Sequence, residues 1–149
     1  MRSRLFWLIS RSAACLYRLF PFRGYLRGAV GIIQREGGYV AVQRNDGFGL
    51  AFPGGMCRRG EDPSQTLARE VREETGLEVS SAVFLFSYRD TSLYPSETHV
   101  FRADASGTLR GSWEGVPLVA PLDTLRGHIM CSQRPIIEWI ENPSESKEN

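Results

Sequence analysis

The sequence of 149 residues predicts a single domain of the α/β or α+β class, in which helices pack against a β-sheet. Apolar, β-branched segments recur between residues 28 and 119, and turn residues such as Gly, Asn and Asp separate them. Helical patterns occupy residues 63–75 and 133–141, so that helices and strands are interspersed. Because no internal repeat or long linker divides the chain, one domain accounts for all of these elements.

Six strands are expected from the apolar segments. The first two are joined by turn residues 35–38 and are expected to form a hairpin, while the third stops at Pro53. A glycine-rich loop over residues 107–115 precedes the last strand. In chain order, the predicted strands cover residues 28–33, 39–43, 50–52, 79–88, 98–103 and 116–119.

The helix predicted over residues 63–75 has boundary signals at both ends. Asp62 is a suitable N-cap, Pro63 fits the first helical position, and Gln65 completes a capping-box pattern. Gly76 can adopt the left-handed conformation that ends many helices. These residues fix where the helix begins and where it stops.

Charge is distributed unevenly along the chain. The first 35 residues contain seven Arg and no Asp or Glu, whereas the remainder contains 11 basic and 17 acidic residues. Because the net charge is only +1, we expect no nucleic-acid partner. The basic segment and the acidic remainder are expected to have different tasks.

Residues 1–24 are predicted to be a basic extension, with an amphipathic helix from residue 4 to about residue 20. Three roles remain open for residues 1–20, which include this helix. It packs on its own domain or on a partner subunit, as in a homodimer; it makes peripheral contact with an anionic membrane; or it is a removable extension. The domain itself is expected over residues 25–142, and residues 143–149 are expected to be a flexible polar tail.

Apolar residues near the start of the chain are too few for a membrane span. The longest run, Leu5 to Ile9, is followed closely by Arg11, whereas a spanning helix needs about 20 apolar residues. The three cysteines are widely separated and lack metal-binding spacing, which is typical of a reducing intracellular compartment. We therefore expect a cytoplasmic protein, with membrane association through the N-terminal helix as the alternative.

Three glutamates on the predicted helix are the main chemical signal. At about 100° per residue, Glu70, Glu73 and Glu74 fall on one face of the helix, and the apolar residues fall on another. Each like-charged pair at this spacing destabilises a helix by about 0.2–0.5 kcal/mol, a cost that a cation among the carboxylates removes. Mg²⁺ prefers such hard oxygen ligands. The alternative is a solvated acidic face that pairs with Arg69 and Arg72.

The surrounding residues favour the metal-binding interpretation. Gly55 is followed, at fixed spacing, by Glu61, Arg69-Glu70-Val71, Glu73-Glu74 and Gly76-Leu77. This pattern resembles the Nudix box, G-x5-E-x7-R-E-U-x-E-E-x-G-U, where U is an aliphatic residue, and all nine specified positions match. The resemblance extends over about residues 28–141 and implies an α/β/α sandwich with a mixed β-sheet.

The Nudix resemblance also implies a role for each residue of the motif. Mg²⁺ or Mn²⁺ is the implied cofactor, with Glu70, Glu73 and Glu74 as its ligands, joined by the backbone carbonyl of Gly55. Arg69 is expected to hold Glu70 or Glu61 by a charge-assisted hydrogen bond. In this interpretation Glu61 fixes the loop and takes no part in the chemistry.

The general base of the implied reaction has several candidates. In some family members it is a glutamate of the box, which is Glu70 here, and in others it is an acid from a later loop. Glu114, next to Trp113, resembles that late acid, while Glu97 and Asp90 are weaker candidates. The residues expected to be catalytic are therefore Glu70, Glu73, Glu74, Arg69 and Glu114.

Nudix proteins hydrolyse nucleoside diphosphates linked to another group, and the expected activity here is that of a nucleoside triphosphate pyrophosphohydrolase. Tyr94 favours dinucleoside polyphosphates as an alternative substrate. ADP-ribose or a nucleotide sugar is a further alternative, although an ADP-ribose enzyme tends to have Pro where Ser92 stands. Tyr94, Phe52 and Arg44 are expected to bind the substrate. An alternative of another class is a module that senses nucleotides without hydrolysing them, and the intact glutamates argue against it.

Overall fold

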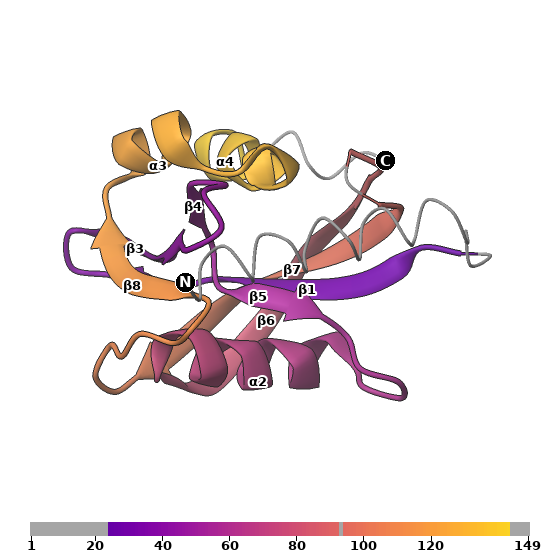
Figure 1. Ribbon diagram of the computed structural model, residues 1–149, viewed down its shortest axis with the longest axis horizontal. Helices are drawn as coiled ribbons and strands as arrows, with labels where there is room; N and C mark the ends of the chain where they lie inside the picture. Colours follow the sequence, from indigo (N-terminus) through magenta and orange to yellow (C-terminus); the bar gives the residue numbers. More distant parts are fainter. Residues whose placement is uncertain (1–23, 93, 144–149) are drawn as a thin grey trace.

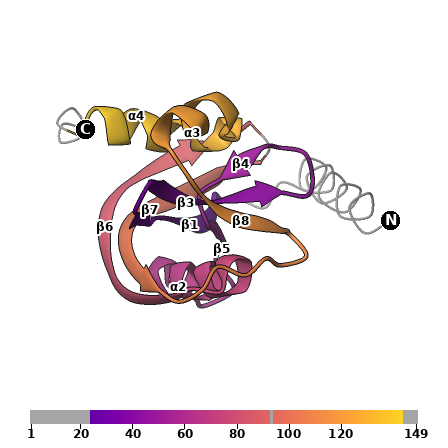
Figure 2. The ribbon, with the colours of Figure 1, turned by 90° about the vertical axis from the view of Figure 1, so that its left-hand side faces the viewer.

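A central layer of β-sheet lies between helices in the computed structural model, which describes residues 24–92 and 94–143. Helix α2 (Pro63–Thr75) covers one face of this layer, and α3 (Leu122–His128) and α4 (Arg134–Glu141) cover the other (Figure 1). Figure 2 shows the same three layers after a quarter turn. This arrangement is the α/β/α sandwich that the Nudix resemblance implies.

Two four-stranded sheets form the central layer. The first has the order β5-β1-β7-β6, in which β1 (Leu26–Ile32) runs parallel to β7 (Ser96–Ser106) and antiparallel to β5 (Gly54–Met56). β6 (Glu78–Asp90) pairs antiparallel with β7, so this sheet is mixed, as expected. In the second sheet, β3 (Gly38–Arg44) pairs antiparallel with β2 (Gln34–Arg35), β4 (Leu50–Ala51) and β8 (Gly115–Ala120).

Strand β1 divides the buried residues into two cores because its side chains alternate between the faces of the sheet. Ala29 and Ile33 pack with the buried residues of α2, whereas Val30 and Ile32 pack with those of α3 and α4. Gly31 lies beneath α2, where a Cβ atom would stand 2.8 Å from a methyl carbon of Leu67. The absence of that side chain lets α2 approach the sheet closely.

Helix α2 has the bounds predicted from the sequence. The backbone N–H of Asp62 donates to the side chain of Gln65 at 3.1 Å, and Gly76 ends the helix with φ at 75°. Leu67 and Val71 are fully buried against the sheet, and each such side chain contributes about 1.5–3 kcal/mol of hydrophobic stabilisation. The helix that carries the glutamates is therefore anchored along its apolar face.

Four elements differ from the sequence-based expectation. In the predicted hairpin, only Gln34 and Arg35 pair with β3, at Tyr39 and Gly38. The residues before them, in β1, pair with β7 in the other sheet. β5 follows Pro53, where a stop was expected, since its glycines pair with β1 through backbone groups alone. α3 was not expected, and the helix predicted over residues 133–141 begins with a 3₁₀ turn, Cys131–Gln133.

Part of the prediction lies outside the described residues. The amphipathic helix over residues 4–20, and all but the first residue of the tail at 143–149, fall in segments of which the structure gives no description. Among the residues that are described, no helix is long and apolar enough to cross a membrane. Cys57 and Cys131, both in the described part, are free cysteines.

Candidate active site

Strand β5 and helix α2 bring the glycines of the motif against its glutamates. A Cβ atom on Gly55 would lie 2.5 Å from the Oε1 atom of Glu70, so only glycine allows this approach. The neighbouring residue, Gly54, has φ at 156° and lies against the backbone of β1. The Gly55 backbone therefore lies beside the Glu70 carboxylate.

Arg69 is the hub of the charged network. Its Nε and Nη2 atoms donate to the two carboxylate oxygens of Glu61 at 2.8 and 2.9 Å, and its Nη1 atom donates to Glu70 at 2.6 Å. Further bonds reach the carbonyl of Met56 at 3.1 Å and Glu73 at 3.3 Å. The sequence predicted one carboxylate partner, Glu61 or Glu70, and Arg69 holds both.

Glu61 fixes the loop before α2, as expected. Besides Arg69, it accepts hydrogen bonds from the backbone N–H of Arg58 and from the hydroxyl of Thr66, both at 2.8 Å. The Arg69 hydrogen bond is the main reason that the pKa of the Glu61 carboxyl lies well below its usual range, and the Arg58 bond adds to it. Glu61 thus stays ionised and has no free position for chemistry.

Glu74 is the buried member of the glutamate face. It accepts a hydrogen bond from the backbone N–H of Gly54 at 2.9 Å. Burial raises the pKa of Glu74 to about 8, and the charges of Glu70 and Glu114 add to this effect, while the Gly54 bond and the charge of Arg44 oppose it. Burial of the ionised Glu74 carboxylate therefore lowers the stability of the fold.

Glu74→Gln is expected to stabilise the metal-free protein, and more at pH 8 than at pH 5. Between its unfolded pKa near 4.5 and its folded pKa of about 8, folded Glu74 keeps a proton that the unfolded chain releases, so stability falls as the pH rises. A difference of one pKa unit between the folded and unfolded states corresponds to about 1.4 kcal/mol of stability, or roughly 4 °C in Tm for a chain of this size. We therefore expect the Tm difference between variant and wild type in EDTA to grow by at least about 4 °C across this range.

Glu78→Gln, at an exposed position on β6, is the matched control and should show no such growth. A Tm difference for Glu74→Gln that is the same at both pH values would contradict the assignment.

The glutamate face carries the charges that a divalent cation would require, although its side chains are engaged elsewhere. In the part of the chain that the structure describes, no three acid, His or Cys side chains are grouped as a closed metal site. Arg69 holds Glu70 and Glu73, and Glu74 is turned toward Gly54. Glu70, Glu74 and Glu114 nevertheless repel one another, and hard oxygen donors under such repulsion fit a divalent cation.

Glu114 and Arg44 face this cluster from the adjoining ends of β8 and β3, where Arg44 pairs with Gly115. Arg44 is held by Asp46, whose carboxylate oxygens accept from its Nε atom at 3.0 and 3.1 Å and also contact its Nη2 atom. Burial lowers the pKa of Arg44, but the bond and charge of Asp46, with those of Glu74 and Glu114, outweigh it and leave the pKa raised. Arg44 is therefore a fixed positive charge beside the glutamates.

Glu114 is half-buried, and its loop is tied to the segment that carries Arg44. The backbone N–H of Asn45 donates to the Glu114 carbonyl at 2.9 Å, and the Asn45 side chain donates to the carbonyl of Trp113 at 3.0 Å. Burial and the charge of Glu70 raise the pKa of the Glu114 carboxyl, while Arg44 opposes them. Glu114 thus lies close to the glutamate face.

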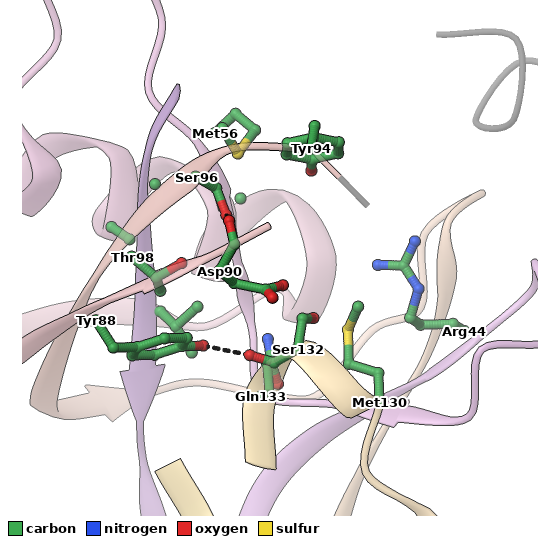
Figure 3. Close-up of a pocket in the computed structure, with 15 residues that line it drawn as sticks. Arg44, Met56, Tyr88, Asp90, Tyr94, Ser96, Thr98, Met130, Ser132 and Gln133 are labelled. Carbon is green, nitrogen blue, oxygen red and sulfur yellow. Dashed lines mark hydrogen bonds between the residues drawn. The ribbon is translucent and has the colours of Figure 1, made fainter. Parts of the chain in front are cut away.

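A cavity of about 130 Å³ adjoins the cluster (Figure 3). Gly54, Gly55 and Arg44 form the part nearest the glutamates. The remaining walls come from β1, β5, β6, β7, the β6–β7 connection and the segment before α4, and include Met56, Tyr88, Asp90, Tyr94, Ser96, Thr98, Met130, Ser132 and Gln133. The pocket therefore meets the charged cluster at Gly54, Gly55 and Arg44.

The other predicted site residues are divided between the pocket and the rest of the fold. Tyr94 and Asp90 line the pocket. Phe52 was predicted to bind substrate, but it is 1% exposed and packs edge-on against Tyr39 in the core, so its ring is unavailable. Glu97 lies on β7 and pairs with Arg89 at 3.3 Å, outside the pocket lining.

Some pocket residues were not predicted from the sequence, because only contacts between distant parts of the chain bring them to the pocket. Gln133 donates to the Phe52 carbonyl at 3.3 Å and accepts from the Phe52 N–H at 2.7 Å, across 81 residues of chain. Thr98, Ser132 and Met130 belong to no motif and reach the pocket only through sheet pairing and this link. Asp46 stands two residues after Arg44, and this short spacing was the one available sign of their pairing.

The fold and the glutamate helix define a class of protein. The model of the NUDIX domain family matches residues 24–139, and the chain belongs to the Nudix hydrolase family. The family predicted from the motif between Gly55 and Leu77 is therefore confirmed, and with it the hydrolase class.

Particular relatives can be named beside this class. A nudix hydrolase family member from Chromobacterium violaceum is 23% identical, with a TM-score of 0.71 over 85% of this chain and 83% of its own. The MutT NUDIX hydrolase from Burkholderia pseudomallei is 21% identical, with a TM-score of 0.69 over 78% of this chain and 98% of its own. At these identities the likeness shows the fold.

One curated relative is closer in sequence over a shorter segment. The CMP-5'-(N-acetyl-N-hydroxy-3-aminopropyl)phosphonate hydrolase of Streptomyces rubellomurinus is 34% identical over 71 residues, which are 47% of this chain and 34% of that protein. The chain thus covers about a third of the length of this relative.

Proposed function

We propose that this protein is a nucleoside triphosphate pyrophosphohydrolase that depends on Mg²⁺ or Mn²⁺. The observation that carries the proposal is the continuity between the glutamate face and the pocket. Gly54 and Gly55 belong to both, because they contact Glu74 and Glu70 and also line the cavity. A nucleotide with its base in the cavity would have its phosphates beside the carboxylates and Arg44.

Each charged residue then has a task in the proposed reaction. A divalent cation held by Glu70, Glu73, Glu74 and the Gly55 carbonyl would polarise the phosphate oxygens and lower the pKa of a bound water. Arg44, fixed by Asp46, would bind a phosphate oxygen and orient the chain of phosphates. Arg69 would hold Glu70 and Glu73 in position without touching the substrate.

The general base in this proposal is Glu114. Its carboxyl is half-buried, faces Glu70 and Arg44, and has a pKa raised by burial, which suits a group that accepts a proton from water. Glu70 is the alternative, although its Oε1 atom accepts a 2.6 Å bond from Arg69. Removal of the base should flatten the acid limb of the rate–pH profile, so Glu114→Gln and Glu70→Gln distinguish the two assignments.

A nucleoside monophosphate linked to another group is the second candidate substrate. The relative from Streptomyces rubellomurinus is named for a CMP-linked phosphonate, and it shares 34% identity over 71 residues. Dinucleoside polyphosphates are a third candidate substrate, because Tyr94 lines the pocket. ADP-ribose and nucleotide sugars are further candidates.

The test is a phosphate-release screen with Mg²⁺ or Mn²⁺ over nucleoside triphosphates, CMP-linked compounds, dinucleoside polyphosphates, ADP-ribose and nucleotide sugars. Each reaction is coupled to pyrophosphatase or phosphatase and repeated in EDTA. We expect triphosphates to release pyrophosphate at the highest kcat/KM, and EDTA to abolish the release. Turnover of another class alone would replace the proposed substrate, and nucleotide binding without any turnover would favour the sensing module.

A further inference from the structure

The pocket has two chemically different ends. Gly54, Gly55 and Arg44 form the end nearest the carboxylate cluster, where the proposed function requires the phosphates. Tyr88, Thr98, Asp90 and Ser132 line the remainder of the pocket (Figure 3). A nucleotide whose phosphates lie beside Arg44 would place its base in this second part.

Asp90, at the end of β6, is the acidic residue of this second part. Its Oδ1 atom accepts the Ser92 N–H at 3.0 Å, and its Oδ2 atom accepts the Ser92 hydroxyl at 2.6 Å. Because a carboxylate has about four acceptor positions, these two bonds fix its orientation and leave acceptor capacity on both oxygens. In Figure 3 the Asp90 carboxylate points toward the interior of the pocket.

Asp90 is separate from the proposed metal ligands. The charges that act on Glu74 are those of Glu70, Glu114 and Arg44, whereas Asp90 acts on Tyr88 and Tyr94. Tyr94, which also lines the pocket, is buried, and both Arg44 and Asp90 influence its pKa, in opposite directions. A carboxylate that lies apart from the cluster requires another explanation.

Neighbouring polar groups of the pocket are committed to the protein. The Gln133 side-chain amide accepts a hydrogen bond from the Phe52 N–H and donates one to the Phe52 carbonyl. The Tyr88 hydroxyl donates to the Ser132 carbonyl at 2.8 Å, and burial raises the pKa of Tyr88 to about 12, so this donor stays protonated. Met56, Met130 and the two tyrosines supply apolar and aromatic surface for a flat ring.

We propose that this pocket selects a nucleobase that bears an exocyclic amino group, which donates hydrogen bonds to the Asp90 carboxylate. Cytosine, adenine and guanine have such a group. Uracil presents a carbonyl oxygen where cytosine has its amine, and hypoxanthine lacks the amine of guanine, so the carboxylate meets repulsion or a lost bond. The inference rests on the proposed function for the placement of the base, and it adds the chemical class of that base.

The test compares matched pairs of substrates. Hydrolysis of CTP is measured against UTP, and of GTP against ITP, with Mg²⁺ and with the full chain as wild type and as Asp90→Asn. For the pair that is turned over, we expect kcat/KM to favour the aminated base by about 10- to 100-fold in wild type, as for a charge-assisted hydrogen bond. In Asp90→Asn, whose amide can donate as well as accept, the ratio should fall to about 3-fold or less.

The matched control is Asp104→Asn. Asp104 lies toward the other end of the β6–β7 pair and also accepts a serine hydroxyl, that of Ser81 at 2.6 Å, but it is outside the pocket. Its variant should keep the wild-type ratio. A wild-type ratio near one, or a ratio unchanged by Asp90→Asn, would overturn the inference, and the wild-type ratio alone decides if Asp90→Asn does not fold.

Binding separates failure of this inference from failure of the proposed function. If no triphosphate is hydrolysed, calorimetric titration of the wild type with CMP against UMP, and with GMP against IMP, measures base selection without catalysis. Preference for the aminated member supports the proposed base selection even when the reaction has been wrongly assigned, and loss of this preference in Asp90→Asn assigns it to that carboxylate. Equal affinity, or preference for UMP and IMP, contradicts it.

Discussion

Glu73→Gln is expected to lower kcat about a thousandfold with little change in Tm. Glu73 is the most solvent-accessible of the three glutamates, with 46% of its side chain exposed, and it makes two 3.3 Å contacts with Arg58 and Arg69. Loss of its charge therefore costs the fold little, whereas a lost anionic ligand removes several kcal/mol of transition-state stabilisation. About 4 kcal/mol corresponds to a factor of a thousand in rate.

Steady-state kinetics on the best substrate of the screen, with saturating Mg²⁺, measures this effect. Glu78→Gln, which removes a charge from the exposed start of β6, is the control and should retain the wild-type kcat. An unaltered rate in a folded Glu73→Gln protein would show that the glutamate face is not the metal site.

Arg69→Ala is expected to lower both stability and activity. The side chain is only 11% exposed and joins Glu61, Glu70 and the Met56 carbonyl, so its removal leaves two carboxylates without their main partner. Loss of one member of such a network costs about 3 kcal/mol, which is roughly 10 °C in Tm for a chain of this length. Because Glu70 and the loop are also released, we expect kcat/KM to fall at least tenfold.

Arg72→Ala is the matched control for this prediction. Arg72 is the other arginine of α2, is exposed, and should cost less than about 0.5 kcal/mol when truncated. Thermal unfolding and kinetics of the two variants at one pH decide the point. Equal Tm values for Arg69→Ala and Arg72→Ala would mean that the network contributes nothing to stability.

Local signals allowed α2 and its glutamates to be predicted from the sequence. Asp62, Pro63, Gln65 and Gly76 act within the helix or one residue beyond it, so the residues that determine its ends are neighbours in the chain. The fixed spacing from Gly55 to Leu77 identified the family for the same reason. Strands with a buried face were also recognisable, because their apolar residues are continuous in sequence.

What could not be predicted depends on partners far along the chain. β5 contains two glycines and Met56, and it is a strand only because β1 offers backbone groups to pair with. α3 is seven residues long with one buried residue, Leu125, which is too short for a clear periodicity. Phe52 was assigned to the site as an aromatic residue that can stack on a base, but its ring is buried in the core.

The Gln133 side chain that bridges to Phe52 has a consequence for the order in which the protein is assembled. β1, β3 and α2 are all synthesised before residue 76, yet the backbone just ahead of Gly54 obtains two of its hydrogen bonds from a residue that follows 81 positions later. Contacts of such separation form late, after local structure has reduced the entropy of closing the chain. Helix α2 is therefore expected to form in the nascent chain before the pocket does. A growing chain would complete the pocket only when residue 133 has docked, so the proposed binding of a nucleotide would wait until the fold is complete.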